Sequence, residues 1–137
     1  MPAGDRFKEA IKRSVELSKA GEDYEALKLL DESIASAIRE KQVPWIITLS
    51  RHAAVISDFI GDTDRRKRYY EQCLQFEPED PLALYGLAEV AHKEGDAELA
   101  RKYAARCHKA IVEGDDELAK QGLLDLVAKR WPEVTGS

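Results

Sequence analysis

The stretch from Asp80 to Val112, DPLALYGLAEVAHKEGDAELARKYAARCHKAIV, decides the fold of this chain. Its first half repeats apolar side chains at offsets of 0, 3, 4 and 7, the spacing of one helix face: Leu84, Leu87, Ala88 and Ala91. Its second half carries a similar apolar face: Ala100, Tyr103, Ala104, Cys107 and Ile111. Between them, Gly95 can end one helix at positive φ and Asp96 can cap the next. The stretch therefore predicts a helix–turn–helix unit.

The same pattern occurs 34 residues upstream, where Gly61 and Asp62 take the places of Gly95 and Asp96. Three core positions also match at this interval, Ala54 with Ala88, Tyr69 with Tyr103 and Cys73 with Cys107. Pro78 closes this earlier unit. One step further back, Gly21 precedes Gly61 by 40 residues, so the first unit is longer. The chain is thus predicted to be a helical repeat array.

A helix–turn–helix unit of 34 residues is the period of tetratricopeptide repeats. The sequence resembles that family at six of its characteristic positions, occupied by Leu84, Leu87, Ala88, Gly95, Ala100 and Cys107. It departs from the family where an apolar or small residue is usual, at Arg13, Ser50, Ser57 and Arg66. The resemblance implies an all-α, single-domain fold over 1–137, with three antiparallel helix pairs stacked in a right-handed superhelix. The repeats would cover about 7–40, 47–80 and 81–114, followed by a capping helix at about 116–131.

Several details of these helices are predicted from local signals. Asp5 is a plausible N-cap for the first helix, and the second helix is expected to span 23–41 with Ile38 on its buried face. Asp80 is expected to cap the helix that begins at Pro81. The capping helix is expected to place its apolar side chains on the core, namely Leu118, Leu123, Leu126, Val127 and Trp131.

The composition indicates a globular protein and gives an expectation for its cellular location. Hydrophobic residues make up 44% and charged residues 34% of 137 residues, and the net charge of −5 argues against a nucleic-acid partner. No secretory leader and no apolar run near the ~20 residues of a membrane span are evident, so a cytoplasmic protein without membrane contact is expected. Cys73 and Cys107 are expected to be reduced core residues, because each takes a small core position of its repeat.

The sequence favours a non-enzymatic protein without cofactor or metal. It has no Gly-rich phosphate loop, no His-Glu-x-x-His motif and no serine elbow. Cys107 and His108 are adjacent, so on a helix their side chains diverge by about 100° and do not form a metal pair.

The run Arg65–Arg68 is the sharpest charge feature of the chain. It could bind phosphate or an acidic partner. However, four consecutive residues are distributed around the whole circumference of a helix and do not form a stripe on one face. A solvated outer face, with Arg66 extending its charged end to solvent, is therefore favoured over nucleic-acid binding.

The resemblance implies that the first helix of each repeat lines a concave groove, which can bind a peptide or a helix of a protein partner. The candidate groove residues are Arg51, Val55, Tyr85, Glu89 and His92, with Asp58 beside them. An ordinary mixed helix surface is the competing interpretation. The basic clamp of chaperone-binding members of the family is absent, because its positions hold Ile11, Val15, His52, Leu82 and Gly86.

A second functional class stays open, a self-assembling structural protein that forms homo-oligomers through its terminal helices. Trp131 and the longer first repeat motivate it, since an exposed Trp131 would indicate a contact.

Overall fold

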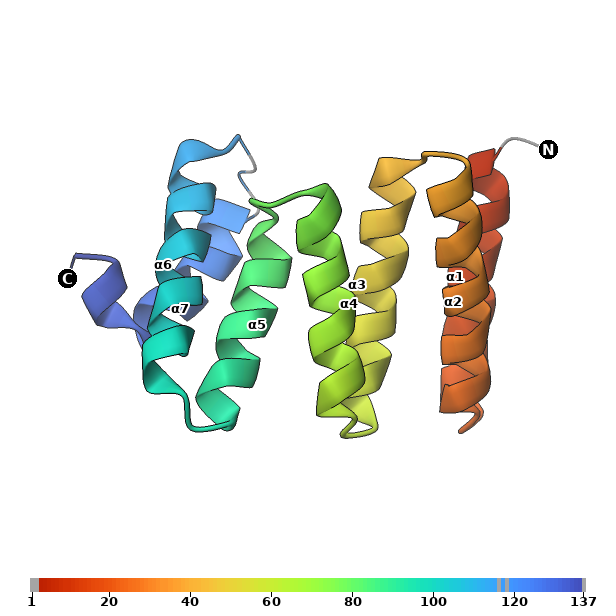
Figure 1. Cartoon of the computed structure of the whole chain (residues 1–137), viewed down its shortest axis with the longest axis horizontal. Helices are drawn as coiled ribbons and strands as arrows, with labels where there is room; N and C mark the ends of the chain where they lie inside the picture. The colour runs from red at the N-terminus through yellow and green to blue at the C-terminus, as the bar shows by residue number, and fades with distance from the viewer. Residues whose placement is uncertain (1–2, 116, 118, 137) are drawn as a thin grey trace. The chain divides into compact units, whose positions relative to one another are not determined.

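The computed structural model describes residues 3–115, 117 and 119–136, and these residues form helices and turns without any strand (Figure 1). The α-helices are α1 (Ala3–Lys19), α2 (Asp23–Arg39), α3 (Val43–Phe59), α4 (Thr63–Phe76), α5 (Pro81–Lys93), α6 (Ala97–Glu113) and α7 (Leu124–Arg130). A π-helical segment, η1 (Ala119–Leu123), precedes α7, and a 3-10 turn, η2 (Pro132–Val134), follows it. Neighbouring helices pack in pairs, α1 with α2, α3 with α4 and α5 with α6. The predicted all-α helical-repeat fold is confirmed.

One kind of turn joins the two helices of every pair. At its centre stands a glycine with positive φ, 80° at Gly21, 76° at Gly61 and 84° at Gly95, a conformation that costs glycine little. The residue after each glycine donates its backbone N–H to a carbonyl five residues back: Glu22 to Leu17 (2.8 Å), Asp62 to Ser57 (2.8 Å) and Asp96 to Ala91 (2.9 Å). The three predicted helix ends are confirmed.

The connection between α2 and α3 uses the same turn without a glycine. Lys41 adopts a φ of 55°, and Gln42 N–H donates to the Ala37 carbonyl over 2.9 Å. α2 ends at Arg39, two residues before the expected end at about residue 41, to make this turn.

Aspartates cap two helices as predicted. The Asp80 carboxylate accepts from the N–H of Ala83 (3.2 Å), and that of Asp96 accepts from the N–H of Leu99 (3.1 Å). Asp5 is not a cap, since α1 begins at Ala3. It lies in the first turn instead, where its charge complements the helix dipole.

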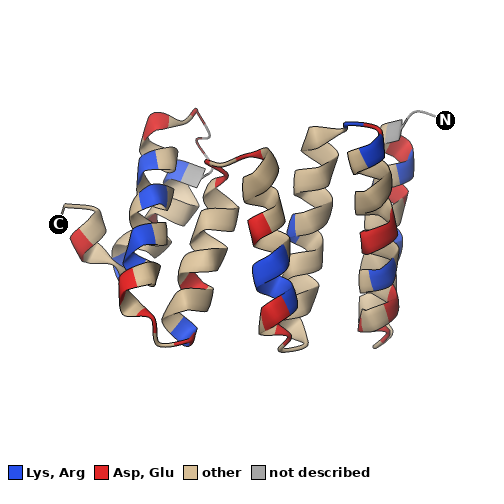
Figure 2. Ribbon diagram, viewed as in Figure 1, with Lys and Arg blue, Asp and Glu red and all other residues tan. Residues whose placement is uncertain are grey.

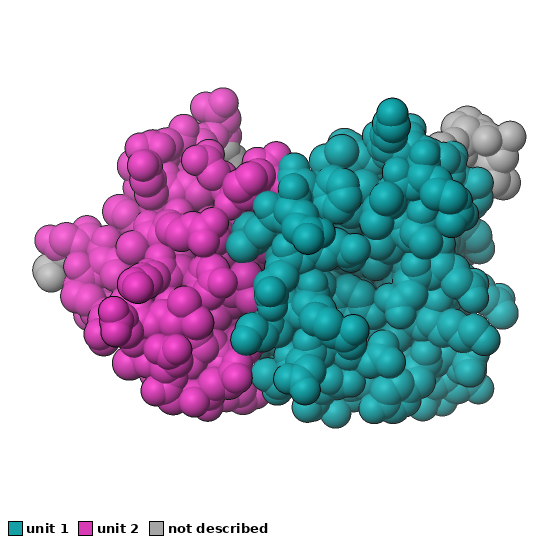
Figure 3. Space-filling view, in the orientation of Figure 1, with its two compact units in different colours: residues 1–76 teal, residues 77–137 magenta. Residues whose placement is uncertain are grey.

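The contacts within the chain divide it into two compact units, unit 1 (residues 1–76) and unit 2 (residues 77–137) (Figure 3). In unit 1, α3 packs against α1, α2 and α4. Its core consists of large apolar side chains such as Phe7, Leu27, Leu30, Ile46 and Leu49.

Two predictions for unit 1 were wrong. Ile38 is exposed rather than buried, because it faces outward between α2 and α4. Arg66 is buried rather than extended into solvent. Its guanidinium lies 3.6 Å from the Asp58 carboxylate and 5.6 Å from the Tyr70 ring centroid, so charge and ring contacts offset its desolvation.

In unit 2, α5 packs on α6, and the segment from η1 to η2 packs against α6, with η1 also against α5. Leu123, Val127 and Trp131 are buried as predicted, whereas Leu126 is exposed. Leu126 directly precedes Val127, so it points about 100° away from this buried side chain on α7. Residues 116 and 118 of the predicted capping helix lie outside the described residues.

The two cysteines show that corresponding positions of two repeats have the same environment. Cys73 Sγ lies 3.8 Å from the Ile47 carbonyl, and Cys107 Sγ lies 3.4 Å from that of Pro81. Both pairs are 26 residues apart, and each member of the second pair follows its counterpart by 34 residues. Both side chains are buried, as expected for small core positions of a repeat, and neither forms a disulfide with a described residue.

Candidate partner-binding surfaces

The five predicted groove residues belong to both units. Arg51 and Val55 lie on α3 in unit 1, whereas Tyr85, Glu89 and His92 lie on α5 in unit 2. Both helices carry few charges compared with α4 and α6 (Figure 2). Each surface is described within its own unit.

An apolar stripe is exposed on α3. Arg51, Val55 and Phe59 follow one another at intervals of four residues, so they share one helix face. Val55 is 62% and Phe59 77% exposed, although both are large apolar side chains on a helix that is otherwise mostly buried. We call these three residues the α3 stripe.

Phe59 was missed by the sequence analysis, which placed Asp58 beside Val55. Asp58 instead lies 3.6 Å from the buried Arg66, so its carboxylate compensates a charge of α4. The four-residue interval from Val55 to Phe59 is the signal that identifies the correct member of the stripe.

The chain's own C-terminal segment covers part of the corresponding surface of α5. Trp131 is only 4% exposed, and its ring meets two predicted groove residues edge to face. The ring centroids lie 6.1 Å apart for Tyr85 and 6.2 Å apart for His92, at interplanar angles of 81° and 88°. This geometry is favourable for aromatic pairs. Trp131 therefore packs on residues that were expected to face a partner.

An ion pair fixes the third of these residues. Arg130 Nη1 lies 3.2 Å from Glu89 Oε2, while the Arg130 guanidinium lies 5.7 Å from the Trp131 ring centroid. Burial, and secondarily the Glu89 carboxylate, raises the pKa of Tyr85, so this phenol stays neutral near pH 7. We call Tyr85, Glu89 and His92 the α5 face. Its aromatic and acidic groups are engaged with Arg130 and Trp131.

Among the described residues, no group of three His, Cys, Asp or Glu side chains could hold a metal ion. In the same part of the chain, no helix is long and apolar enough to cross a membrane.

Comparison with known proteins places the chain beside one segment of a much longer protein. No family model matches it. Over 121 residues, which are 86% of the chain, its sequence is 28% identical to "Cellulose synthase operon protein C" of Pseudomonas fluorescens (strain SBW25). The chain spans only 9% of the length of that relative.

Proposed function

We propose that this chain is a non-catalytic protein-binding module of the tetratricopeptide type, and that it receives a peptide or helix of a partner on the α3 stripe. One observation carries the proposal. Val55 and Phe59, at 62% and 77% exposure, form an apolar pair one helical turn apart. Burial of such side chains by a partner is favourable at roughly 25 cal/mol per Å² of apolar surface.

The chemistry of the stripe also suggests the kind of partner. Arg51 lies one turn from Val55 on the same face, and a guanidinium binds carboxylates in a geometrically specific way. An amphipathic segment with apolar anchors and a nearby acidic residue would match this arrangement. The repeated turns and the equivalent cysteine environments support a repeat module as the scaffold.

The α5 face has a conditional role in this proposal. Tyr85 and His92 contact Trp131, and Glu89 pairs with Arg130, so a partner that engages them must first displace the C-terminal segment. Among the described residues of unit 1, no segment competes in this way with a partner that binds the α3 stripe. We therefore expect the α3 stripe to contribute most of the binding energy.

Affinity capture followed by quantitative mass spectrometry tests the proposal. Val55→Asp places a charge in the stripe, and Val112→Asp makes the same change at an exposed position of α6. Proteins that the wild type retains should be lost by Val55→Asp and kept by Val112→Asp. Equal retention by both variants would move the binding surface away from the stripe.

Self-assembly is the alternative that the same variants can separate. An exposed Trp131 would have favoured self-assembly, but this side chain is buried. Light scattering of the wild type over a range of concentrations measures the mass directly. A dimer that Val55→Asp dissociates would reassign the stripe to contacts between copies of the chain.

A further inference from the structure

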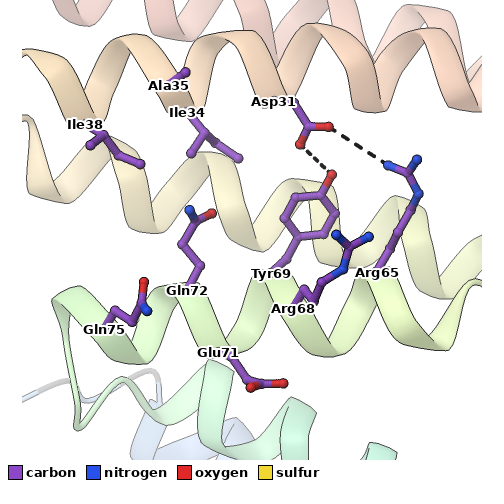
Figure 4. A pocket seen from close by; sticks show the side chains of 10 residues that line it. All are labelled: Asp31, Ile34, Ala35, Ile38, Arg65, Arg68, Tyr69, Glu71, Gln72 and Gln75. Carbon is purple, nitrogen blue, oxygen red and sulfur yellow. Dashed lines mark hydrogen bonds and ion pairs between the residues drawn. The ribbon is translucent and has the colours of Figure 1, made fainter.

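A second surface of unit 1 has the features of a binding site. A pocket of about 600 Å³ lies between α2 and α4 (Figure 4). It arises because both helices pack on α3, which leaves the outer space between them unfilled. The lining residues of this α2–α4 pocket are Asp31, Ile34, Ala35, Ile38, Arg65, Arg68, Tyr69, Glu71, Gln72 and Gln75.

One end of the pocket is closed by a fixed polar network. The Tyr69 hydroxyl donates to the Asp31 carboxylate over 2.6 Å, which joins α4 to α2. Arg65 lies 3.9 Å from Asp31 and 3.1 Å from Asp62, so the charges at this end are compensated (Figure 4). The side chains of Tyr69, Asp31 and Arg65 at this end are therefore engaged with one another and with Asp62.

The two walls beyond this network differ in character. The α2 wall is apolar, with Ile34 buried at its base and Ala35 and Ile38 exposed. The α4 wall offers amide groups. The Gln72 carbonyl accepts from the Ser50 hydroxyl (3.2 Å), which leaves its NH₂ group as a donor, and Gln75 is exposed without a hydrogen bond to any described residue.

Arg68 and Glu71 are the charged groups of the pocket without a partner among the described residues, and of the two only Arg68 faces α2 (Figure 4). Arg68 is therefore the group available to a ligand. It is exposed and makes neither a hydrogen bond nor an ion pair with the residues that the structure describes. Figure 4 shows its guanidinium beside Tyr69 on the side that faces α2, whereas Glu71 points away from α2. A cation without a partner among the described residues thus lies at the Tyr69 end of the pocket, and the apolar Ala35 and Ile38 lie farther along α2 (Figure 4).

We propose that the α2–α4 pocket binds a short peptide segment in which an acidic side chain lies close to aliphatic ones. The carboxylate would pair with Arg68, and the aliphatic side chains would pack on Ala35 and Ile38. Main-chain carbonyls of the peptide would accept hydrogen bonds from the amide groups of Gln72 and Gln75. This site is separate from the α3 stripe and does not depend on it.

The spacing along α4 favours a peptide over a small carboxylate. Arg68 and Gln75 lie seven positions apart with Gln72 between them, which is roughly 10 Å along a helix with a rise of about 1.5 Å per residue. An extended peptide covers that length with about three residues at roughly 3.3 Å each. A small anion could reach Arg68 but not both glutamines.

A random octapeptide display library tests the proposal directly. Wild-type protein is used for selection, and Ala35→Phe for counter-selection, because an exposed alanine accepts a phenylalanine that fills the hollow. Enriched peptides should carry Asp or Glu within three positions of Leu, Ile or Val. Failure to enrich any peptide over the counter-selection, or enrichment of peptides without an acidic residue, would overturn the proposal.

The affinity of the most enriched peptide then identifies the site. By fluorescence anisotropy, Arg68→Glu should weaken its binding at least tenfold, while Arg101→Glu, an equal charge change at an exposed position of α6, should change it less than twofold. Ala105→Phe makes the same change at an exposed position of α6 and is therefore the matched control for Ala35→Phe. Equal effects of Arg68→Glu and Arg101→Glu on the peptide affinity would contradict the proposal that the peptide binds in the α2–α4 pocket. Val55→Asp should leave this affinity unchanged, so failure at the pocket and failure at the α3 stripe are distinguishable.

Discussion

Burial raises the pKa of the Cys107 thiol to about 12, and the Asp80 carboxylate adds to this effect. The folded chain therefore keeps the thiol proton at pH values where the unfolded chain, with a thiol pKa near 9.0, loses it. The corresponding contribution to stability is complete below about pH 9 and falls as the pH rises toward 12. The loss reaches at most about 1.4 kcal/mol per pH unit.

Urea unfolding at several pH values between 8 and 10 measures this dependence. The stability of the wild type should fall with pH more steeply than that of Cys107→Ala, which lacks the titrating group. Other alkaline titrations are common to both proteins, so the difference between the two slopes isolates the thiol. Equal slopes would mean that Cys107 titrates alike in the folded and unfolded chains.

Some residue environments could be read from the sequence and others could not. The buried cysteines follow from their 34-residue spacing, because equivalent repeat positions have equivalent neighbours. The hydrogen bond between Tyr69 and Asp31 joins residues 38 positions apart. Periodicity within one helix contains no information about such a partner.

At the scale of elements, Trp131 is the side chain that anchors the C-terminal segment on unit 2. Its replacement by alanine should cost about 3 kcal/mol, because a buried aromatic side chain and its contacts with Tyr85 and His92 are lost. Leu126→Ala is the matched control on α7 and should cost less than about 0.5 kcal/mol, since that side chain is exposed. Chemical denaturation followed by circular dichroism measures both. Similar losses of stability in the two variants would show that the C-terminal segment packs on unit 2 through a face other than the one that carries Trp131.

The helices were predictable where a strong local signal marks their ends. Gly21, Gly61 and Gly95 end three helices at positive φ, and Asp80 and Asp96 cap two others. The end of α2 was not predictable, because Lys41 adopts positive φ without being a glycine. On α7 the buried face follows Leu123, Val127 and Trp131 at intervals of four residues, and Leu126 lies outside it.

At the scale of the whole molecule, the repeat pattern predicted the architecture better than the site. The interval of 34 residues identifies the paired helices, because each pair must bury the same face. It does not identify which exposed faces stay uncovered. The positions of Trp131 and Arg130 on the α5 face depend on how the C-terminal segment packs, and no pattern in α5 itself reveals that. The groove at Arg51, Val55, Tyr85, Glu89 and His92 remains a prediction. Its α3 stripe is the part that no described segment of its own unit covers.

Site-specific photo-crosslinking tests the central claim, that a partner binds the α3 stripe. The photoreactive residue p-benzoylphenylalanine replaces Phe59, aromatic for aromatic, and in a second protein it replaces the exposed Val112. Irradiation in cells of the source organism should yield an adduct with another protein at position 59, which Val55→Asp abolishes, and none at position 112. Adducts at position 112 but not at position 59 would contradict the account. Adducts of the chain with itself at position 59 would establish self-assembly instead.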